Sequence, residues 1–202
     1  MKIYVDFEMN EIHDNKGEVI SIGAIKVVDR VITDEFHTLV CPVLTDFISP
    51  MITIMTGLKY EDLVNAPYFY TAFHSFMEWS CEAEVIYCWG SADVDSIYYS
   101  YSLNERFLKR KSEDKKNMNK IIKNKFLDLR EYIEIYDYTL SRLSLVNLHQ
   151  CMLNKKINMR NLHNPVYDSY LLFEIHTLFK DKLTKEKFHF QKEGSVLNAE
   201  SM

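Results

Sequence analysis

Two acidic residues with a single residue between them, Asp6 and Glu8, stand near the start of the chain. They belong to a segment, residues 2–8, in which apolar and polar side chains alternate as in a β-strand with one buried face. Side chains two apart on a strand project from the same face, so the two carboxylates repel each other unless a cation lies between them. Mg²⁺ and Mn²⁺ prefer such oxygen ligands. The pair therefore indicates either a metal site or a solvated strand end.

A further acid follows a short apolar run. Residues 84–89 are almost entirely apolar, which is typical of a buried central strand, and Gly90 ends the run. A helix that begins at Ser91 would hold Asp93 in its first turn, at the carboxyl end of the strand, where α/β proteins place ligands. The alternative is that Asp93, or its neighbour Asp95, is a surface acid favoured by the helix dipole.

A histidine and an acid flank a predicted helix start late in the chain. Asn164 is a good N-cap and Pro165 fits the first helical position, so the sequence predicts a helix over residues 165–179. His163 then lies just outside this helix and Asp168 about one turn inside it. A fixed carboxylate can hold a metal while an adjacent imidazole takes a proton from water, and this arrangement suits both tasks.

Hydrophobic periodicity and turn residues predict the elements that must position these side chains. Three strands open the chain, over residues 2–8, 18–28 and 31–40, and Asp29-Arg30 joins the second and third as a hairpin. Two further strands are predicted over 84–89 and 126–129, and helices over 68–80, 91–108, 130–138, 144–153 and 165–179, with short helical pieces between 49 and 67. The pattern is a β-meander followed by mixed α/β structure in a single domain.

The composition fits one globular domain. The chain has 202 residues, 47% of them hydrophobic, which is enough for one sizeable core and excludes a disordered chain. No window approaches the roughly 18 apolar residues of a membrane span, and the first residues do not form a secretory signal. Four widely separated cysteines predict reduced thiols. We therefore expect a cytoplasmic protein, with a folded domain over residues 1–180 and a polar tail over 181–202.

Charge is distributed unevenly along the chain. The net charge of −5 argues, as an average, against an ordinary nucleic-acid-binding domain, which is usually basic. Residues 105–125, however, contain nine basic and three acidic residues, a balance of +6 that leaves −11 for the rest. This basic segment is either a solvated face or a guide for a phosphate backbone. The average charge therefore does not exclude a nucleic-acid substrate.

The order of the pieces resembles the DEDDh family of 3′-to-5′ exonucleases, which includes RNase T and polymerase proofreading subunits. The likeness spans residues 2–180. Residues 17–24 resemble the second strand of the family, and Met55-Thr56-Gly57-Leu58 with Ala66-Pro67 resembles its "T-G-I … A-P" segment. Trp89-Gly90 ahead of Asp93 is most similar to the Eri-type and KapD-type branch, and that alignment favours Asp93 over Asp95.

The resemblance implies an RNase H-like α/β fold, with a mixed five-stranded sheet flanked by helices, for an exonuclease domain over residues 1–180. It implies that Asp6, Glu8 and Asp168 hold one metal, that Asp6 is shared with a second metal supported by Asp93, and that His163 is the general base. The two ions would be Mg²⁺ or Mn²⁺. The partner would be single-stranded RNA or DNA, hydrolysed from its 3′ end to nucleoside 5′-monophosphates, with no membrane partner; a homodimer stays open.

Five residues near these motifs are candidates for contacts with the terminal nucleotide: Phe7, Met9, Asn10, Met55 and Thr56. For Phe7, packing in the core is an equal alternative. The chain departs from the family at Pro165 and Ser169, where alanine is common. Neither departure removes a proposed ligand, so we expect an active enzyme. The alternatives are a catalytically silent nucleic-acid-binding module with the same fold, and a hydrolase that acts on a small nucleotide.

Overall fold

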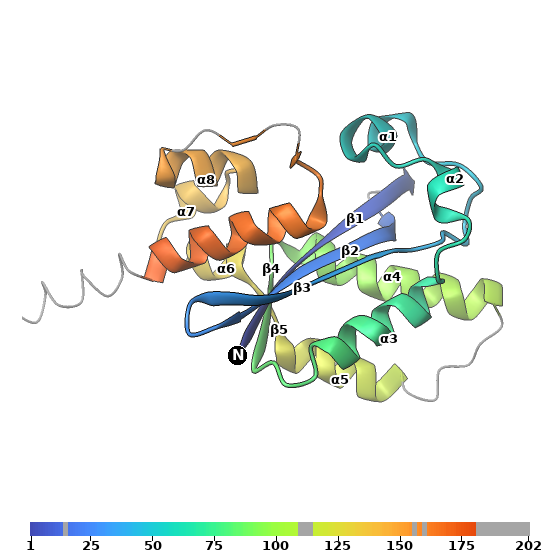
Figure 1. The fold of residues 1–202 in the computed structure, drawn as a ribbon, viewed down its shortest axis with the longest axis horizontal. Helices are drawn as coiled ribbons and strands as arrows, with labels where there is room; N and C mark the ends of the chain where they lie inside the picture. Colours follow the sequence, from blue (N-terminus) through green and yellow to red (C-terminus); the bar gives the residue numbers. More distant parts are fainter. Residues whose placement is uncertain (14–15, 109–114, 155–156, 159–160, 181–202) are drawn as a thin grey trace, which may run out of the picture.

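A single five-stranded sheet forms the centre of the molecule, which is described here from a computed structural model (Figure 1). The structure describes residues 1–13, 16–108, 115–154, 157–158 and 161–180. The strand order is β3-β2-β1-β4-β5. The strands are β1 (Lys2–His13), β2 (Lys16–Val28), β3 (Val31–Leu39), β4 (Val85–Cys88) and β5 (Phe126–Asp128). β1 pairs antiparallel with β2 and parallel with β4, β2 pairs antiparallel with β3, and β4 pairs parallel with β5, so the predicted mixed sheet is confirmed.

Helices cover both faces of this sheet (Figure 1). One face carries α3 (Phe69–Trp79), α4 (Ser91–Leu108) and α5 (Lys115–Lys125). The other carries α6 (Leu129–Glu134), α7 (Tyr138–Ser141), α8 (Leu145–Leu153) and a helix over residues 165–180, drawn orange to red. Two short helices, α1 (Pro50–Thr56) and α2 (Tyr60–Leu63), lie near the far end of β1. Of the helices described, none is both long enough and apolar enough to cross a membrane.

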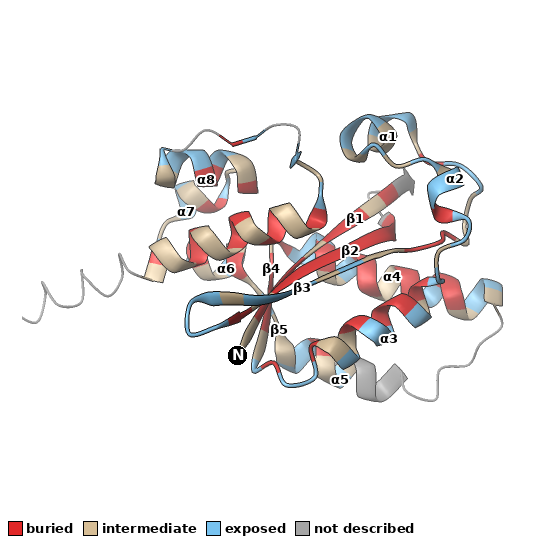
Figure 2. Cartoon of the chain, viewed as in Figure 1, coloured by how far each residue is buried: buried red, intermediate tan, exposed pale blue. Residues whose placement is uncertain are grey.

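The alternation predicted for the first strand divides the core into two layers. Ile3, Val5 and Phe7 are buried in a cluster with α3 and α4. Tyr4 belongs instead to the cluster that packs against the helix over residues 165–180. Figure 2 shows β1, β2 and β4 as largely buried, whereas β3 is exposed along much of its length. Because side chains alternate along a strand, Asp6 shares the face of Tyr4 and is directed toward the helix over 165–180.

The predicted hairpin between β2 and β3 is present, and its turn has an unusual backbone. Asp29 and Arg30 have φ angles of 50° and 67°, in the left-handed region. Two-residue hairpin turns favour positive φ at both positions because this matches the twist of the strands, and they usually contain glycine or asparagine. Here two charged residues adopt that conformation.

The structure departs from the predicted elements chiefly at β1, at the basic segment and at the helix predicted over 130–138. β1 continues to His13 because β2 pairs with it along its whole length. The basic segment contains α5, which the sequence analysis did not predict, and the predicted helix over 130–138 is divided into α6 and α7. Part of the basic segment, residues 109–114, and the predicted tail, residues 181–202, lie outside the described residues.

Candidate active site

Four acidic side chains from three separate elements come together beside the central strand β1. Asp6 and Glu8 come from β1, Asp93 from the first turn of α4, and Asp168 from the helix that begins at residue 165. Glu8, Asp93 and Asp168 are 8%, 4% and 7% exposed, and Asp6 is half-buried. Buried acids are rare in proteins unless they are paired with a cation or used chemically.

The electrostatics of this acidic cluster show how closely the four carboxylates lie. Burial raises the pKa of Asp6 well above its ordinary value, and the charges of Asp93, Glu8 and Asp168 raise it further. Burial, with the charges of Asp168 and Asp93, raises the pKa of Glu8 to about 8. Burial also raises the pKa of Asp93 to about 8 and that of Asp168 to about 6. The cluster therefore resists full ionisation unless positive charge is supplied.

The atoms available for a metal are close together. Glu8, His163 and Asp168 each offer one ligand atom, and these three atoms lie within 4.8 Å of one another. In the described part of the chain, Oδ1 of Asp168 is buried and has no hydrogen-bond partner, while Oδ2 accepts a hydrogen bond of 3.1 Å from the backbone N–H of His163. A buried, unpartnered carboxylate oxygen is costly, and ligation of a hard cation would satisfy it. The cluster fits a divalent metal.

Asp93 is held in place by a turn that the sequence analysis did not connect with the site. The N–H of Trp89 donates to Oδ2 of Asp93 at 3.0 Å. The next N–H, of Gly90, donates to Oδ1 of Asp128 at 2.8 Å, and Gly90 has a φ of 97°. The same Asp128 oxygen accepts a 2.8 Å hydrogen bond from Arg130 and so caps α6. Asp128 is the positioning residue that was missed; an acid inside the predicted strand over 126–129, two residues before a predicted helix, was the available signal.

Asp93 and Asp95 differ in their surroundings. Asp93 is buried among the other acids, whereas Asp95 is exposed. The surface-acid alternative therefore describes Asp95 and not Asp93.

His163 lies just before the helix start, as the cap residues predict. The side chain of Asn164 accepts hydrogen bonds from Val166 and Tyr167, at 3.1 and 3.2 Å. His163 itself is half-buried and has a φ of 61°, a left-handed conformation that is strained for a residue other than glycine. Burial lowers the pKa of its imidazole, which favours the neutral form that can accept a proton.

The start of the helix over 165–180 is held tightly against β2. A Cβ atom on Gly23 would lie 2.3 Å from the backbone nitrogen of Val166 and 2.4 Å from the carbonyl carbon of Pro165. The hydroxyl of Ser169 donates to the carbonyl oxygens of Gly23 and Pro165, at 3.0 and 2.8 Å. The close approach and these hydrogen bonds fix the position, relative to β2, of the helix that carries Asp168.

An open pocket of about 490 Å³ lies beside His163. Its lining comes from Ser21, His37 and Leu39, from residues 54–58 and from residues 161–165. Met55, which is exposed, and Thr56 both line this pocket, and their contacts with a nucleotide stay a prediction. His37 also lines the pocket, and its Nε2 is 3.1 Å from the hydroxyl of Ser21. It was not predicted as a site residue because it belongs to none of the sequence motifs.

The other three candidates for nucleotide contacts do not line this pocket. Phe7 is buried and packs edge-to-face on Phe76, with ring centroids 6.4 Å apart, which favours the core-packing alternative. Met9 packs against the same core. Asn10 is buried; its side-chain N–H donates to the carbonyl of Phe47 at 3.1 Å, and its Oδ1 accepts from the N–H of Ser49 at 2.9 Å. Asn10 thus anchors the loop that leads into α1.

Residues 119–125, the end of the basic segment whose side chains are described, do not contact the pocket beside His163. Ile122 is buried in the core, and Nζ of Lys125 donates to the carbonyl oxygen of Cys81 at 2.8 Å. None of the side chains described for residues 119–125 lines the pocket beside His163. The described part therefore favours a structural role for this end of the segment.

Solved structures of nucleases share this fold. The nuclease domain of 3′hExo, a DEDDh family member bound to rAMP, is 16% identical, with a TM-score of 0.67 over 89% of this chain and 92% of that chain. The zinc-bound complex of E. coli ExoI with ssDNA is 14% identical, with a TM-score of 0.65 over 91% of this chain and 41% of that chain. Exonuclease X in complex with 5′ overhanging duplex DNA is 15% identical, with a TM-score of 0.56 over 88% of this chain and 92% of that chain. The predicted RNase H-like fold is confirmed.

The sequence matches a known protein family over most of its length. The RNase T family, described as Exonuclease, matches residues 3–175, a range that contains the four acids of the cluster and His163. No curated protein matches the sequence. The similarity to the Eri-type and KapD-type branch stays a prediction. With the family match over most of the chain and the fold of the DEDDh nucleases, this protein belongs to the RNase T family of exonucleases.

Proposed function

We propose that this nuclease is a 3′-to-5′ exonuclease that hydrolyses single-stranded RNA or DNA to nucleoside 5′-monophosphates, with two divalent cations, Mg²⁺ or Mn²⁺. The observation that carries the proposal is the group of four interacting carboxylates, two of which, Glu8 and Asp168, offer ligand atoms within 4.8 Å of a ring nitrogen of His163. His163 in turn lines an open pocket. Similar folds include a structure described as 3′-end specific recognition of histone mRNA stem-loop by 3′-exonuclease and the ExoI complex with ssDNA, which supports the direction and the single-stranded substrate.

The family depends on divalent metals, and the acidic cluster is suited to hold them. In the proposal, Asp6, Glu8 and Asp168 hold one ion, while Asp6 also reaches a second ion that Asp93 supports. When bound, two such ions activate a water and stabilise charge on the attacking and leaving oxygens. The unpartnered Oδ1 of Asp168 and the raised pKa values of Asp6 and Glu8 are the features of this chain that favour a cation here.

His163 would act as the general base. Burial lowers its pKa, so the neutral imidazole is available to accept a proton from the attacking water near neutral pH. Its backbone N–H is bonded to Asp168, so the base and a metal-holding acid are oriented together. The terminal nucleotide would occupy the pocket between Met55, Thr56 and His163.

The direct test is a digestion of 5′-labelled RNA and DNA oligonucleotides with Mg²⁺, with Mn²⁺ and with a chelator. A ladder of shortened, labelled products together with released nucleoside 5′-monophosphates is expected in the presence of metal only. The matched variants are Asp6→Asn, which removes a central carboxylate, and Asp95→Asn, which removes an exposed one from the neighbouring helix. Loss of products in the first variant and retention in the second would support the assignment.

Two other outcomes contradict the proposal. Metal-dependent stabilisation and oligonucleotide binding without any shortening would identify a silent binding module. Cleavage of a dinucleotide with no action on longer strands would identify a hydrolase of small nucleotides. The division into a domain over 1–180 and a tail over 181–202, the cytoplasmic location and the homodimer stay predictions; comparing a chain that ends at residue 180 with the full chain in the same assay tests the division.

A further inference from the structure

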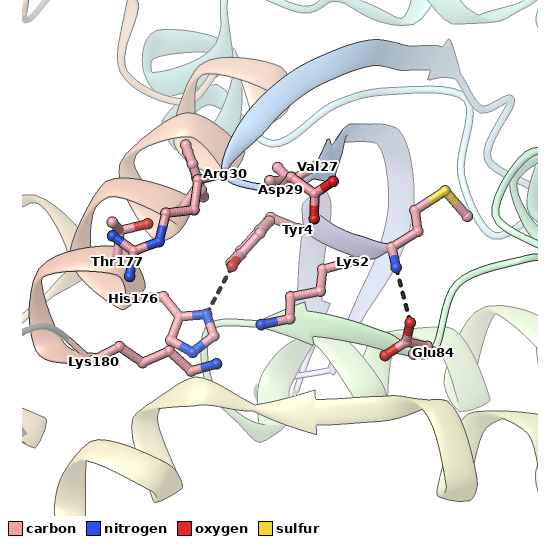
Figure 3. Close-up of a pocket in the computed structure, with 11 residues that line it drawn as sticks. Lys2, Tyr4, Val27, Asp29, Arg30, Glu84, His176, Thr177 and Lys180 are labelled. Carbon is pink, nitrogen blue, oxygen red and sulfur yellow. Dashed lines mark hydrogen bonds and ion pairs between the residues drawn. The ribbon is translucent and has the colours of Figure 1, made fainter. Parts of the chain in front are cut away.

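A second pocket lies at the opposite end of the elements that carry the acidic cluster (Figure 3). It has a volume of about 330 Å³ and is lined by residues from the start of β1, the turn between β2 and β3, and the end of the helix over 165–180. Lys2 is four residues before Asp6 on the strand, a separation of about 13 Å. Lys180 is twelve residues after Asp168 on the helix, about 18 Å. This pocket is therefore separate from the proposed active site.

The pocket is rich in cationic side chains. Lys2, Arg30 and Lys180 all line it, and Figure 3 shows them around the same hollow. Among the described lining residues the acids are Asp29 and Glu84, and Oε1 of Glu84 is bonded to the terminal nitrogen of Met1 at 3.0 Å. Counted together, the described lining groups comprise four cationic groups, including the terminal amine of Met1, and two acids, so the lining has a formal excess of positive charge that attracts a multiply charged anion.

The protein holds these like charges close together at an electrostatic cost. A hydrogen bond with Lys2, together with partial burial and the charges of Lys2 and Arg30, lowers the pKa of Lys180 to about 8. An anion in the pocket would relieve the repulsion between these groups. The neighbouring His176 is buried, and its Nδ1 lies 2.8 Å from the hydroxyl of Tyr4, so this part of the pocket wall is fixed.

The hairpin turn between β2 and β3 fixes the position of Arg30. Its φ of 67° would suit glycine or asparagine better than arginine, and Asp29 beside it also has a positive φ. The two-residue turn between β2 and β3 imposes this conformation at both positions. In this turn, the strained position is the one that brings a guanidinium to the pocket.

We propose that this basic pocket binds a small phosphate-bearing anion of nucleotide size. A guanidinium can make two parallel hydrogen bonds to a phosphate, and ammonium groups complement its charge. Arg30, Lys2 and Lys180 would contact the phosphate oxygens, and the hydroxyl of Thr177 offers a neutral donor. Phe173 lines the same pocket and gives an apolar wall for the organic part of the ligand. The volume is at the small end of the range for ligand pockets, roughly 300 Å³ and above, which fits a small molecule.

Calorimetric titration of the full chain with adenosine 5′-monophosphate and with inorganic phosphate, in the presence of a chelator, tests this proposal. The chelator removes metal-mediated binding at the acidic cluster, and Asp6→Asn should bind as the natural chain does. Arg30→Gly and Lys180→Gln should each weaken binding at least tenfold, whereas Lys123→Gln, a change on the exposed face of α5, should not. Arg30→Gly should also raise the unfolding temperature without ligand, because glycine relieves the left-handed strain, so weaker binding cannot be attributed to unfolding.

The outcomes separate the sources of the phosphate. Tighter binding of the nucleotide than of inorganic phosphate supports a free nucleotide as the ligand. Binding that requires an oligonucleotide would assign the pocket to a nucleic-acid strand and overturn the small-molecule proposal. No binding at millimolar ligand, or equal binding by the natural chain and both pocket variants, would also overturn it.

Discussion

The hydroxyl of Ser169 donates a hydrogen bond of 3.0 Å to the carbonyl oxygen of Gly23, a residue 146 positions earlier in the chain. Ser169 follows Asp168 directly, so this bond joins the helix that carries an acid of the cluster to the sheet that carries two others. Gly23 permits the approach because a Cβ atom there would meet the helix backbone. The geometry of the acidic cluster therefore depends on a contact between residues that bear no charge.

Replacing Gly23 with alanine should damage both stability and activity. The added Cβ would lie 2.3 Å from the backbone nitrogen of Val166, and backbone cannot yield as a flexible side chain does. We expect a loss of about 1–3 kcal/mol in the free energy of unfolding, as for other overpacked sites. Ser169→Ala is the matched comparison: it removes the hydrogen bonds without a clash, and should cost about 1 kcal/mol and leave activity within a few-fold. Denaturant unfolding and digestion rates measure both; an unaffected Gly23→Ala would contradict the positioning role.

Asp6→Asn should stabilise the metal-free protein while removing activity. The change relieves repulsion with Glu8, Asp93 and Asp168, so the free energy of unfolding in chelator should rise by an amount on the order of 1 kcal/mol. Divalent metal should stabilise the natural chain, since a ligand that binds the folded state shifts the unfolding equilibrium. The variant should lose most of that gain, and the exposed Asp95→Asn should keep it. An equal metal-dependent shift in both variants would show that the acidic cluster is not where the metal binds.

His163→Asn should separate the role of a base from the role of a ligand. Asparagine tolerates positive φ, so the fold should be retained at this left-handed position. Loss of a general base slows a reaction by roughly 10²–10⁴-fold, and we expect a fall in the hydrolysis rate in that range. The metal concentration needed for half-maximal stabilisation should change little. A parallel loss of metal affinity would instead make His163 a ligand, which its distance from Glu8 and Asp168 permits.

The buried His176 should make stability fall in mild acid. Burial and the charges of Lys180 and Lys2 lower its pKa to about 3, whereas the unfolded chain binds a proton there below about pH 6.5. Between these values the unfolded state holds the extra proton at this site, so the stability that His176 contributes rises with pH and is lost as the pH falls toward 3. The acidic cluster contributes in the opposite direction, because its raised pKa values favour protonation in the folded state, and the comparison of the variant with the natural chain isolates the histidine. His176→Gln should reduce the slope of unfolding free energy against pH by up to about 1.4 kcal/mol per pH unit.

Urea unfolding at several pH values between about 4.5 and 7 measures this slope. His74→Gln, at an exposed histidine on α3, is the matched control variant. If His176→Gln and the natural chain share one slope, the histidine is protonated in the folded state and its burial does not govern the acid response.

Local features of the sequence account for the parts of the fold that were predicted. The alternation in residues 2–8, the apolar run before Gly90 and the cap formed by Asn164 and Pro165 each depend on neighbouring residues, and each is present in the structure. The order of the acids along these elements was enough to suggest the family, because each acid follows a recognisable strand end or helix start. The boundaries of β1 and the helix α5 were not predictable in this way. Pairing with β2 extends β1 beyond its predicted end. Packing of Ile122 into the core stabilises α5, although the helix carries a run of like charges.

By itself the sequence determined which residues can do chemistry and which local elements carry them, since both depend on residue types and short-range periodicity. Only the tertiary structure decided that Asp93 and not Asp95 is buried with the other acids, and that Phe7 packs in the core. The contacts of Gly23 with the helix start, and the gathering of Lys2, Arg30 and Lys180 around one pocket, join residues far apart in the chain. Such contacts leave no periodic pattern, because they are set by how the helix over 165–180 lies across the sheet.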